Sequence, residues 1–469
     1  MKITKFLMAS LLLSAFTFVS CSDDDNNTPT TPVDEVVILE GNLETTTLTK
    51  DNKYLLRGQV FVRDGKVLTI QPGTIIKGDK ATKGTLIIDR GGKIEAVGTA
   101  TEPIVMTSNL AVGERDRGDW GGLVILGRAT NNQRNAPGSS TEWPQIEGIS
   151  PAVEHGGNID NDDSGALVYV RVEYAGIELS PNNETNSITL GSVGSQTQLE
   201  YCQVSFGGDD GFEWFGGTVN GKYLISFASW DDSFDVDFGY SGKNQFGVEV
   251  RYPSFADQSG SNSFECDNGP ADNAYTSYTT GVFSNFTCIG PKATNTQSIS
   301  ASYQHSIDLR RATAVTIANS VFVGYPRGIR MNQQSVYNNF NNDGRGNLLN
   351  NVLHHVGSSK FTVGSGMTAT AADLEAYWTA NGNTTNSNED FAAALTALGI
   401  NGNVFFGANV TSGYSSNPSF AVTSGLLTSG ASFTNSKLEG LDTTTYVGAF
   451  GANDWTDGWA SFLPNSNPY

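Results

Sequence analysis

The chain has 469 residues, and its 28 lysines and arginines against 48 aspartates and glutamates give a formal net charge of −20 at pH 7. Such a charge argues against nucleic acid and anionic lipid surfaces as partners, and it suits cation binding or solubility at a surface. With only 16% charged residues and 53 glycines, the composition excludes a disordered chain and is typical of an all-β protein rich in turns.

The N-terminus has the three regions of a secretory signal. Lys2 and Lys5 precede an apolar run at residues 6–19, which is too short to span a membrane. The tetrapeptide FVSC that ends at Cys21 resembles the lipobox of bacterial lipoproteins, and the acidic tract at 22–27 is similar to the signal that exports lipoproteins to the outer surface in Bacteroidetes. The resemblance implies a signal peptide at 1–20, a lipidated Cys21 with a disordered tether at 21–37, and a lipid-anchored location on the outer membrane that faces the cell exterior.

Three cysteines remain after lipidation, namely Cys202, Cys266 and Cys288. An odd number permits at most one disulfide bond and leaves a free thiol, so the chain is not a disulfide scaffold. Which two of the three would pair is left open by the sequence.

The first part of the globular chain reads as short strands. From residue 38 to residue 108, β-rich runs alternate with glycine and proline turns, and no helical pattern separates them. This excludes a doubly wound α/β fold and leaves a sandwich, a barrel or a β-helix. Residues 115–165 are longer than one coil requires and carry Trp143 and many charged residues. We predict that they form a lateral loop, where binding residues commonly lie.

Residues 209–239 contain the same phrase twice. Asp209-Asp210-x-Phe212-Glu213 returns 22 residues later as Asp231-Asp232-x-Phe234-Asp235. A repeat of this length is typical of one turn of a solenoid, in which each unit stacks on the next. In a parallel β-helix, equivalent residues of neighbouring coils lie about 4.8 Å apart. The acidic residues should therefore stand in columns.

Such columns need compensation, because like charges about 5 Å apart repel by about 3 kcal/mol per pair at an effective dielectric constant of 20. A bound cation, nearby basic side chains or protonated carboxyls would supply it. The alternative interpretation is a set of solvated turn residues, since Asp-Asp-Gly favours turns. We predict a metal site, with calcium as the expected ion, at Asp209, Asp210, Glu213, Asp231, Asp232, Asp235 and Asp237.

Basic side chains gather in the second half of this acidic chain. They could compensate the acidic columns, face an anionic ligand, or do both. Aromatic side chains beside carboxylates would suit a sugar, because they offer a large contact area with a polar edge. The ligand-binding candidates are Trp214, Trp230, Arg310, Arg311, Arg327 and Arg330.

Three further patterns concern the second half of the chain. Asparagines open four apolar strands, and we predict that they stack and satisfy one another's amides. An alanine-rich stretch at 370–399 predicts a helical insertion, and the aromatic-rich residues 443–469 are expected to close the stack. The asparagines are Asn285, Asn319, Asn351 and Asn403.

Several blocks resemble a family of Bacteroidetes surface lipoproteins with a pectate-lyase-like solenoid. They include LTIQPGTII at 68–76, GDWGGLVI at 118–125, ALVYVRVEYAG at 166–176 and the repeat at 209–239. The resemblance implies an all-β fold, a right-handed parallel β-helix with lateral loops and a small helical insertion near 370–399, built as a single domain from 38 to 469. It implies a fold and a location, and it carries no activity.

Three functions are compatible with these observations. The first is a non-catalytic surface module that binds a glycan, a cation-bridged ligand or an outer-membrane protein. The second is a polysaccharide lyase or hydrolase that uses the aspartate cluster as acid and base. The third is a structural adhesin or spacer whose acids keep it soluble. The fold alone does not decide among them.

Overall fold

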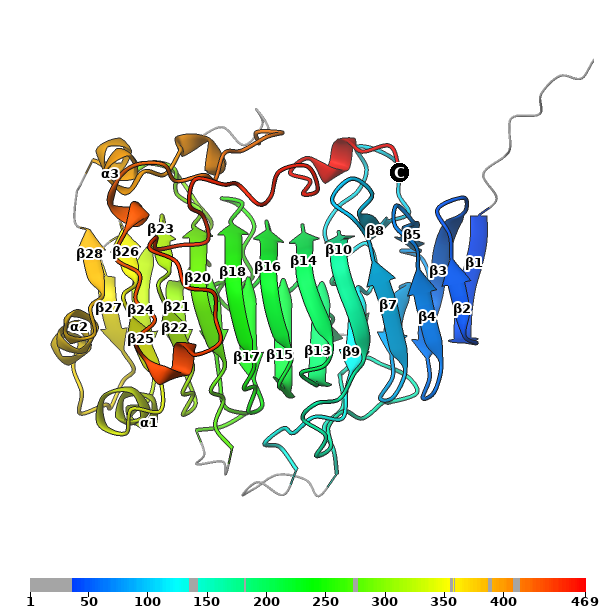
Figure 1. Cartoon of the computed structure of the whole chain (residues 1–469), viewed down its shortest axis with the longest axis horizontal. Helices are drawn as coiled ribbons and strands as arrows, with labels where there is room; N and C mark the ends of the chain where they lie inside the picture. Colours follow the sequence, from blue (N-terminus) through cyan, green and yellow to red (C-terminus); the bar gives the residue numbers. More distant parts are fainter. Residues whose placement is uncertain are drawn as a thin grey trace, which may run out of the picture. The chain divides into compact units, whose positions relative to one another are not determined.

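The chain winds into coils, and successive coils contribute strands to three parallel stacks (Figure 1). The computed structural model describes residues 36–134, 142–180, 183–272, 277–354, 357, 359–386, 390–407 and 414–469. The predicted signal peptide and Cys21 lie outside the described residues. Residues 36 and 37, predicted as the end of the tether, already belong to β1 (Val36–Leu43).

Each stack is built from strands that pair in parallel with those of the coils before and after. The first contains β2 (Thr46–Leu48), β4 (Val67–Ile70), β7 (Lys93–Val97), β22 (Thr316–Ala318), β25 (Asn347–Leu349) and the first halves of β10 (Gly165–Glu173), β14 (Gln198–Ser205), β16 (Asn220–Phe227), β18 (Lys243–Val250) and β20 (Val282–Ile289). The second contains the second halves of those five, the first halves of β1 and β3 (Lys53–Val62), and β5 (Ile75–Gly78), β8 (Ile104–Ser108), β23 (Val321–Val323), β26 (Val352–His354) and β28 (Thr384–Asn386).

The third stack carries the candidate site. It contains the second halves of β1 and β3, followed by β6 (Thr85–Ile88), β9 (Leu123–Leu126), β13 (Ile188–Val193), β15 (Phe212–Gly217), β17 (Phe234–Asp237), β19 (Phe264–Cys266), β21 (His305–Leu309), β24 (Arg327–Met331) and β27 (Ser359–Val363). A separate antiparallel pair, β11 (Glu178–Ser180) and β12 (Asn183–Glu184), lies outside the stacks. The predicted parallel β-helix is confirmed.

Single residues in the left-handed region make the corner between the first and second stacks. This conformation costs a non-glycine residue about 1–2 kcal/mol. The stacking of four of these corner side chains offsets part of that cost. The rings of Tyr169, Tyr201, Tyr223 and Phe246 follow one another at centroid distances of 4.4, 4.3 and 5.2 Å. The corner residues are Tyr169, Tyr201, Tyr223, Phe246, Asn285, Asn319 and Asn350, with φ between 51° and 62°.

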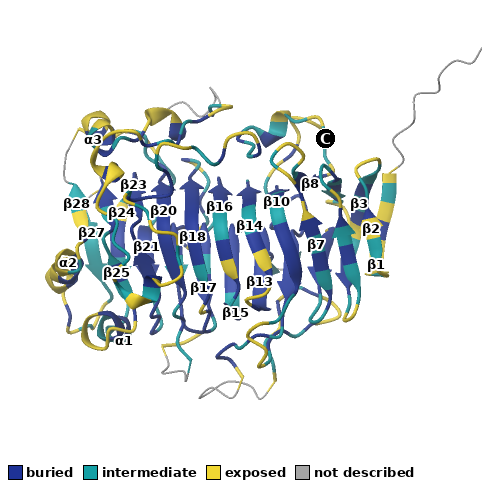
Figure 2. Ribbon diagram, viewed as in Figure 1, coloured by how far each residue is buried: buried dark blue, intermediate teal, exposed yellow. Residues whose placement is uncertain are grey.

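The interior of the coils is apolar along its length, and Figure 2 shows buried residues running through the strands. On the third stack, Phe212, Phe234 and Phe264 stack at centroid distances of 6.0 and 5.0 Å. Trp214 points into the same core and is fully buried. It therefore cannot offer its ring to a ligand, and we withdraw it from the ligand-binding candidates. The three cysteines are free and buried.

Helices interrupt the coils near the C-terminal end of the stacks. The short α1 (Gln334–Tyr337) continues into a π-helical turn at Asn338–Asn342. Thr370 and Asp373 form a capping box at the start of α2 (Ala371–Ala380), which packs on β27, and Asp390 caps α3 (Phe391–Leu398). The predicted helical insertion is confirmed. No described helix is long and apolar enough to cross a membrane.

The segment 414–469 lies on the outer face of the first and second stacks, and its last part, from Tyr446 to Tyr469, runs back along the second stack against the direction in which the coils advance (Figure 1). Its 3₁₀ turns lie at Leu426–Thr428, Ser436–Leu438 and Pro464–Ser466, and another at Gly402–Val404 precedes it. The side chain of Gln245 bonds Asp442, that of Gln203 bonds Ser461, and Lys77 donates to the Tyr469 carbonyl at 3.0 Å. We expected this segment to close the stack, and it instead lines one side.

The predicted asparagine ladder is largely wrong. Asn285 and Asn319 occupy the same corner, but their amides bond the backbone of residues 432–448 rather than each other. Asn350 takes the next corner position, and Asn351 bonds Asn383 one coil later. Asn403 lies in a 3₁₀ turn outside the ladder. Asn285 and Asn319 therefore attach residues 432–448 to the coils.

Candidate functional site

The two copies of the acidic phrase form neighbouring coils. Strand β15 pairs with β17 so that Glu213 lies beside Asp235 and Phe212 beside Phe234. The backbone N–H of Asp232 donates to Oδ1 of Asp210 at 2.7 Å. The predicted columns are confirmed, and because successive residues on a strand point to opposite faces, Glu213 and Asp235 point away from the core that holds Trp214.

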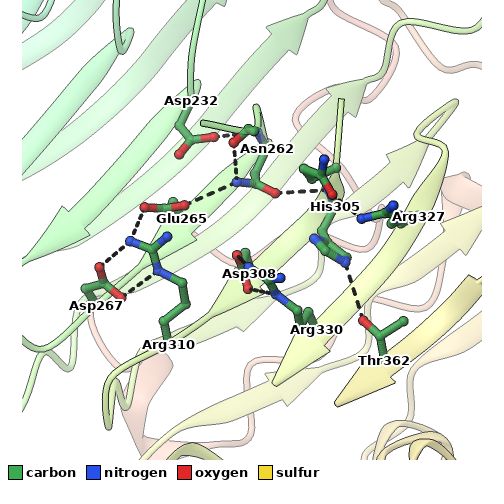
Figure 3. Close-up of polar contacts among 12 residues, drawn as sticks. Asp232, Asn262, Glu265, Asp267, His305, Asp308, Arg310, Arg327, Arg330 and Thr362 are labelled. Atoms are coloured by element: carbon green, nitrogen blue, oxygen red, sulfur yellow. Dashed lines mark hydrogen bonds and ion pairs between the residues drawn. The ribbon is translucent and has the colours of Figure 1, made fainter. Parts of the chain in front are cut away.

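The column continues beyond the repeat on the outer face of the third stack. Asp235 lies beside Glu265, Glu265 beside Asp308, and Asp308 beside Arg330. A second series runs through the turns that precede these strands. Asp232 accepts the N–H of Asn262, and Asn262 accepts the N–H of His305 at 2.9 Å (Figure 3). Asp210 and Asp232 therefore each use one oxygen to join coils.

Arginines neutralise the later part of the column (Figure 3). Arg310 pairs with Glu265 and also binds Asp267 through Nε at 3.0 Å and Nη2 at 2.6 Å. The Arg311 guanidinium lies 2.7 Å from Asp267, and Arg330 donates to Asp308 at 2.7 Å. Three of the four predicted arginines thus compensate acids within the protein. The fourth, Arg327, is exposed and bonds Gln304.

The earlier part of the column has only weaker compensation, because burial, which raises the pKa of Asp235 and of Asp231, outweighs the opposing charges of Arg310 and Arg251. No described lysine or arginine forms an ion pair with any of the seven acids of the predicted metal site. Six of these acids, together with Glu265, instead gather in overlapping trios whose ligand oxygens all lie within 4.8 Å of one another, whereas Asp237 belongs to none of these trios. The trios are Asp209 with Asp210 and Asp231, Asp210 with Glu213 and Asp235, and Asp232 with Asp235 and Glu265.

Burial and mutual repulsion change the protonation of these groups. Burial, and then the charges of Asp235 and Asp209, raise the pKa of Glu213 well above its ordinary value. Burial, followed by the charges of Asp267 and Asp237, does the same to the pKa of Asp235. Burial raises the pKa of Asp231 to about 6. The site thus favours either protonated carboxyls or a bound positive charge.

Oxygen atoms without a partner lie among these carboxylates. Asn186 is only 5% exposed, and its Nδ2 donates to Thr189 at 3.2 Å and to Glu213. Its Oδ1 has no hydrogen-bond partner among the described residues, and neither has Oδ1 of Asp235. Asn186 and Glu213 line a cavity of about 260 Å³ together with Asp209 and Asp210. Asn186 thus brings an acceptor without a described partner to a cavity that has room for a cation, whereas Asp235 is not among the residues that line it.

A family model described as the pectate-lyase-like β-helix domain matches residues 41–396. The chain belongs to this family. Comparison with curated proteins and with solved structures found no match. Membership accounts for the fold of this pectate-lyase-like domain, and its chemistry has to be argued from the residues at the site.

The donors of this pectate-lyase-like domain fit calcium. Calcium takes six to eight oxygen ligands, mostly carboxylate and amide oxygens, in a flexible arrangement. The three trios and Asn186 supply such oxygens and no sulfur or imidazole nitrogen. The donor set therefore favours a hard cation over zinc or copper. Asn186 escaped the sequence analysis because it lies outside the repeat, so no periodic pattern marks it.

A larger cavity lies on the other side of the lateral loop, which is defined here as residues 142–164. The predicted loop at 115–165 was therefore too long, because it included β9, which belongs to the third stack. The cavity measures about 720 Å³ and is lined by Trp143. Around it lie three ion pairs, formed by Arg63 with Asp89 at 3.0 Å, Arg128 with Asp64 at 2.7 Å and Arg90 with Glu154 at 3.5 Å.

Trp230, the other predicted aromatic platform, is partly buried and occupied. Its indole N–H donates to Asp257 at 2.9 Å, and the guanidinium of Arg117 lies 3.2 Å from the ring centroid. An arginine in this position covers one face of the ring. The guanidinium of Arg134 lies 4.4 Å from the Trp143 ring centroid, so Trp143 is covered in a similar way, and what distinguishes Trp143 is that it lines the 720 Å³ cavity.

Proposed function

We propose that this protein is a lipid-anchored, outward-facing β-helix module of the outer membrane, in which a calcium ion bound by the acidic trios supports the binding of a glycan. The anchor is Cys21, and the membrane is reached through its acyl chains. An outer-membrane protein is the alternative ligand. The β-helix family membership supports the architecture, and the chemistry of the acidic cluster supports the cation.

One observation carries the cation proposal: six of the seven predicted acids gather in trios and form no ion pair with a described lysine or arginine, while Glu265, Asp267 and Asp308 are paired with arginines. Two carboxylates about 5 Å apart repel by about 3 kcal/mol at an effective dielectric constant of 20. Selection for mere solubility would not require such packing at a partly buried place. A divalent cation converts this repulsion into attraction and also uses the free oxygen of Asn186.

The glycan proposal rests on the 720 Å³ groove. Arginine–carboxylate pairs present donors and acceptors side by side, which suits the hydroxyl groups of a sugar. The indole of Trp143 adds an apolar surface on which the C–H face of a sugar ring can pack. Because the three arginines are balanced by three carboxylates, the groove favours a neutral sugar over a strongly anionic one.

Thermal unfolding of residues 22–469 with calcium or with chelator tests the cation. A ligand that binds only the folded state raises the unfolding midpoint by mass action. We expect calcium to raise the midpoint of the parent by several degrees and to leave the Glu213→Gln/Asp235→Asn variant unchanged. The matched control is Glu114→Gln/Glu375→Gln, which removes the same charge from two exposed positions and should respond like the parent.

Two results would replace this proposal. If calcium shifts neither the parent nor the control, the acids are solvated turns and the spacer or adhesin function takes its place. If the protein depolymerises a polysaccharide and Asp235→Asn abolishes this, the cluster is catalytic and the protein is a lyase or hydrolase.

A further inference from the structure

The cavity beside Glu213 has two walls that come from different parts of the chain. The inner wall is the sheet, with Asp209, Asp210 and Glu213. The outer wall carries Glu147 from the lateral loop and Glu184 from β12. Neither outer acid belongs to the repeat, and no lysine or arginine is among the residues that line the cavity.

The two walls interact electrostatically. Burial, and then the charge of Glu184, raise the pKa of Glu147. After burial and Asp231, the charges of Glu184 and Glu147 contribute to the raised pKa of Asp209. Five carboxylates thus surround a space of about 260 Å³. When these carboxylates are charged they repel one another, and a cation between the two walls would relieve this repulsion.

Apolar contacts hold the lateral loop on the sheet, and the loop lies where the charge in the cavity can move it. Ile146, Ile149 and Val153 pack on the outer face of the third stack. Gln145 and Glu154 form an antiparallel bridge across the loop. Gln145 lines both the acidic cavity and the 720 Å³ groove. A movement of the loop would therefore change both spaces.

We propose that Glu147 and Glu184 complete the calcium site from outside, so that the ion ties the lateral loop to the sheet and sets the width of the groove lined by Trp143. This inference rests on the proposed calcium site. The buried Oδ1 of Asn186, which lacks a partner among the described residues, lies between the walls as an additional ligand. Calcium–oxygen distances of 2.3–2.6 Å place opposite ligands about 5 Å apart. Neither outer acid belongs to a trio whose oxygens lie within 4.8 Å of one another, so the ion has to draw the loop toward the sheet to bind both walls.

The test combines calcium titration by calorimetry with hydrogen exchange of the loop, on the protein from residue 22 to 469. In the parent, calcium should bind and should slow the exchange of amides in residues 144–156. The Glu147→Gln/Glu184→Gln variant should bind calcium at least tenfold more weakly and should lose this protection. The single variant Glu147→Gln should show a smaller effect in the same direction, and the Glu114→Gln/Glu375→Gln control should behave as the parent.

The outcomes separate this inference from the function on which it rests. If the parent binds no calcium, both fail. If the parent binds calcium and the Glu147→Gln/Glu184→Gln variant binds it equally well with the same loop protection, only the inference fails. If Glu213→Gln/Asp235→Asn abolishes binding while the outer-wall variant weakens it and frees the loop, both stand. Glu147 is exposed, so its substitution should leave the fold intact.

Discussion

Glu213 and Asp235 lie side by side on neighbouring parallel strands, and both carboxylates point away from the core. One coil further along, Glu265 occupies the same position and is paired with Arg310. The boundary between unpaired and paired acids therefore falls between two adjacent coils. This boundary separates the acids for which we propose a cation from those that arginines neutralise.

Stability in chelator should fall as the pH rises. A carboxyl whose pKa is higher in the folded state than in the unfolded state binds more protons when folded, so stability decreases with pH between the two pKa values. Burial raises the pKa of Asp231 to about 6 and raises those of Glu213 and Asp235 well above their ordinary values. We expect a lower unfolding midpoint at pH 7.5 than at pH 5.5.

The measurement is the unfolding midpoint at both pH values, with chelator and with calcium. In the Glu213→Gln/Asp235→Asn variant, the unfolding midpoint should fall less between the two pH values. In the parent, calcium should oppose the fall because the ion binds the charged carboxylates. A midpoint in chelator that rises with pH would contradict the raised pKa values.

Removing Arg310 should be costly. Arg310→Ala leaves Glu265 and the almost fully buried Asp267 without their closest partner, and breaking a buried pair in this way costs about 3–5 kcal/mol. The exposed Arg327 gives the control, because surface substitutions usually change stability by no more than about 0.5 kcal/mol. Denaturant unfolding of Arg310→Ala and Arg327→Ala measures both. Equal effects would show that the pair contributes nothing.

Asn319 should respond differently to alanine and to glycine. Its backbone is left-handed at φ 53°, and its side chain exchanges two hydrogen bonds with the Ser432 backbone. Asn319→Gly loses the bonds at about 1 kcal/mol each and removes the backbone strain. Asn319→Ala loses the same bonds and adds strain, so it should be about 1–2 kcal/mol less stable than the glycine variant. Identical denaturation midpoints would contradict this account of the corner.

Sugar binding should depend on Trp143 and not on Trp230. Affinity electrophoresis in gels that contain mixed-linkage β-glucan, a neutral probe, or polygalacturonate, an acidic one, measures this. We expect retardation by the neutral probe, its loss in Trp143→Ala, and parent-like behaviour of Trp230→Ala, whose ring is not part of the lining of the groove. If neither probe retards the parent, or if Trp143→Ala migrates as the parent does, the groove is not a site for such glycans.

The register of the acidic columns was predictable because a phrase repeated at a constant spacing aligns one coil on the next. The same pattern contained the orientation of Trp214. Alternation along a strand sends Trp214 inward when Glu213 points outward. The burial of Trp214 was therefore predictable from the position of the acids, and its place among the ligand-binding candidates was wrong.

Other features left no periodic signal. Arg310 pairs with residues 43 and 45 positions earlier, although a coil of the repeat has 22, because loops of unequal length separate the later strands. Glu147, Glu184 and Asn186 come from outside the repeated phrase. Their approach depends on how the lateral loop folds on the apolar residues of the sheet, which is a tertiary property.

The C-terminal residues that run back along the coils also constrain the order in which the chain can fold. The Lys77 amine meets a carbonyl 392 residues later in the chain, and Gln203 meets one 258 residues later. Contacts between such distant residues form slowly, because the intervening chain must be ordered first. The first coils to leave a ribosome or a secretion channel therefore keep one side uncovered until residues beyond 440 arrive. A chaperone that protects exposed strands would have this side as its natural substrate during that interval.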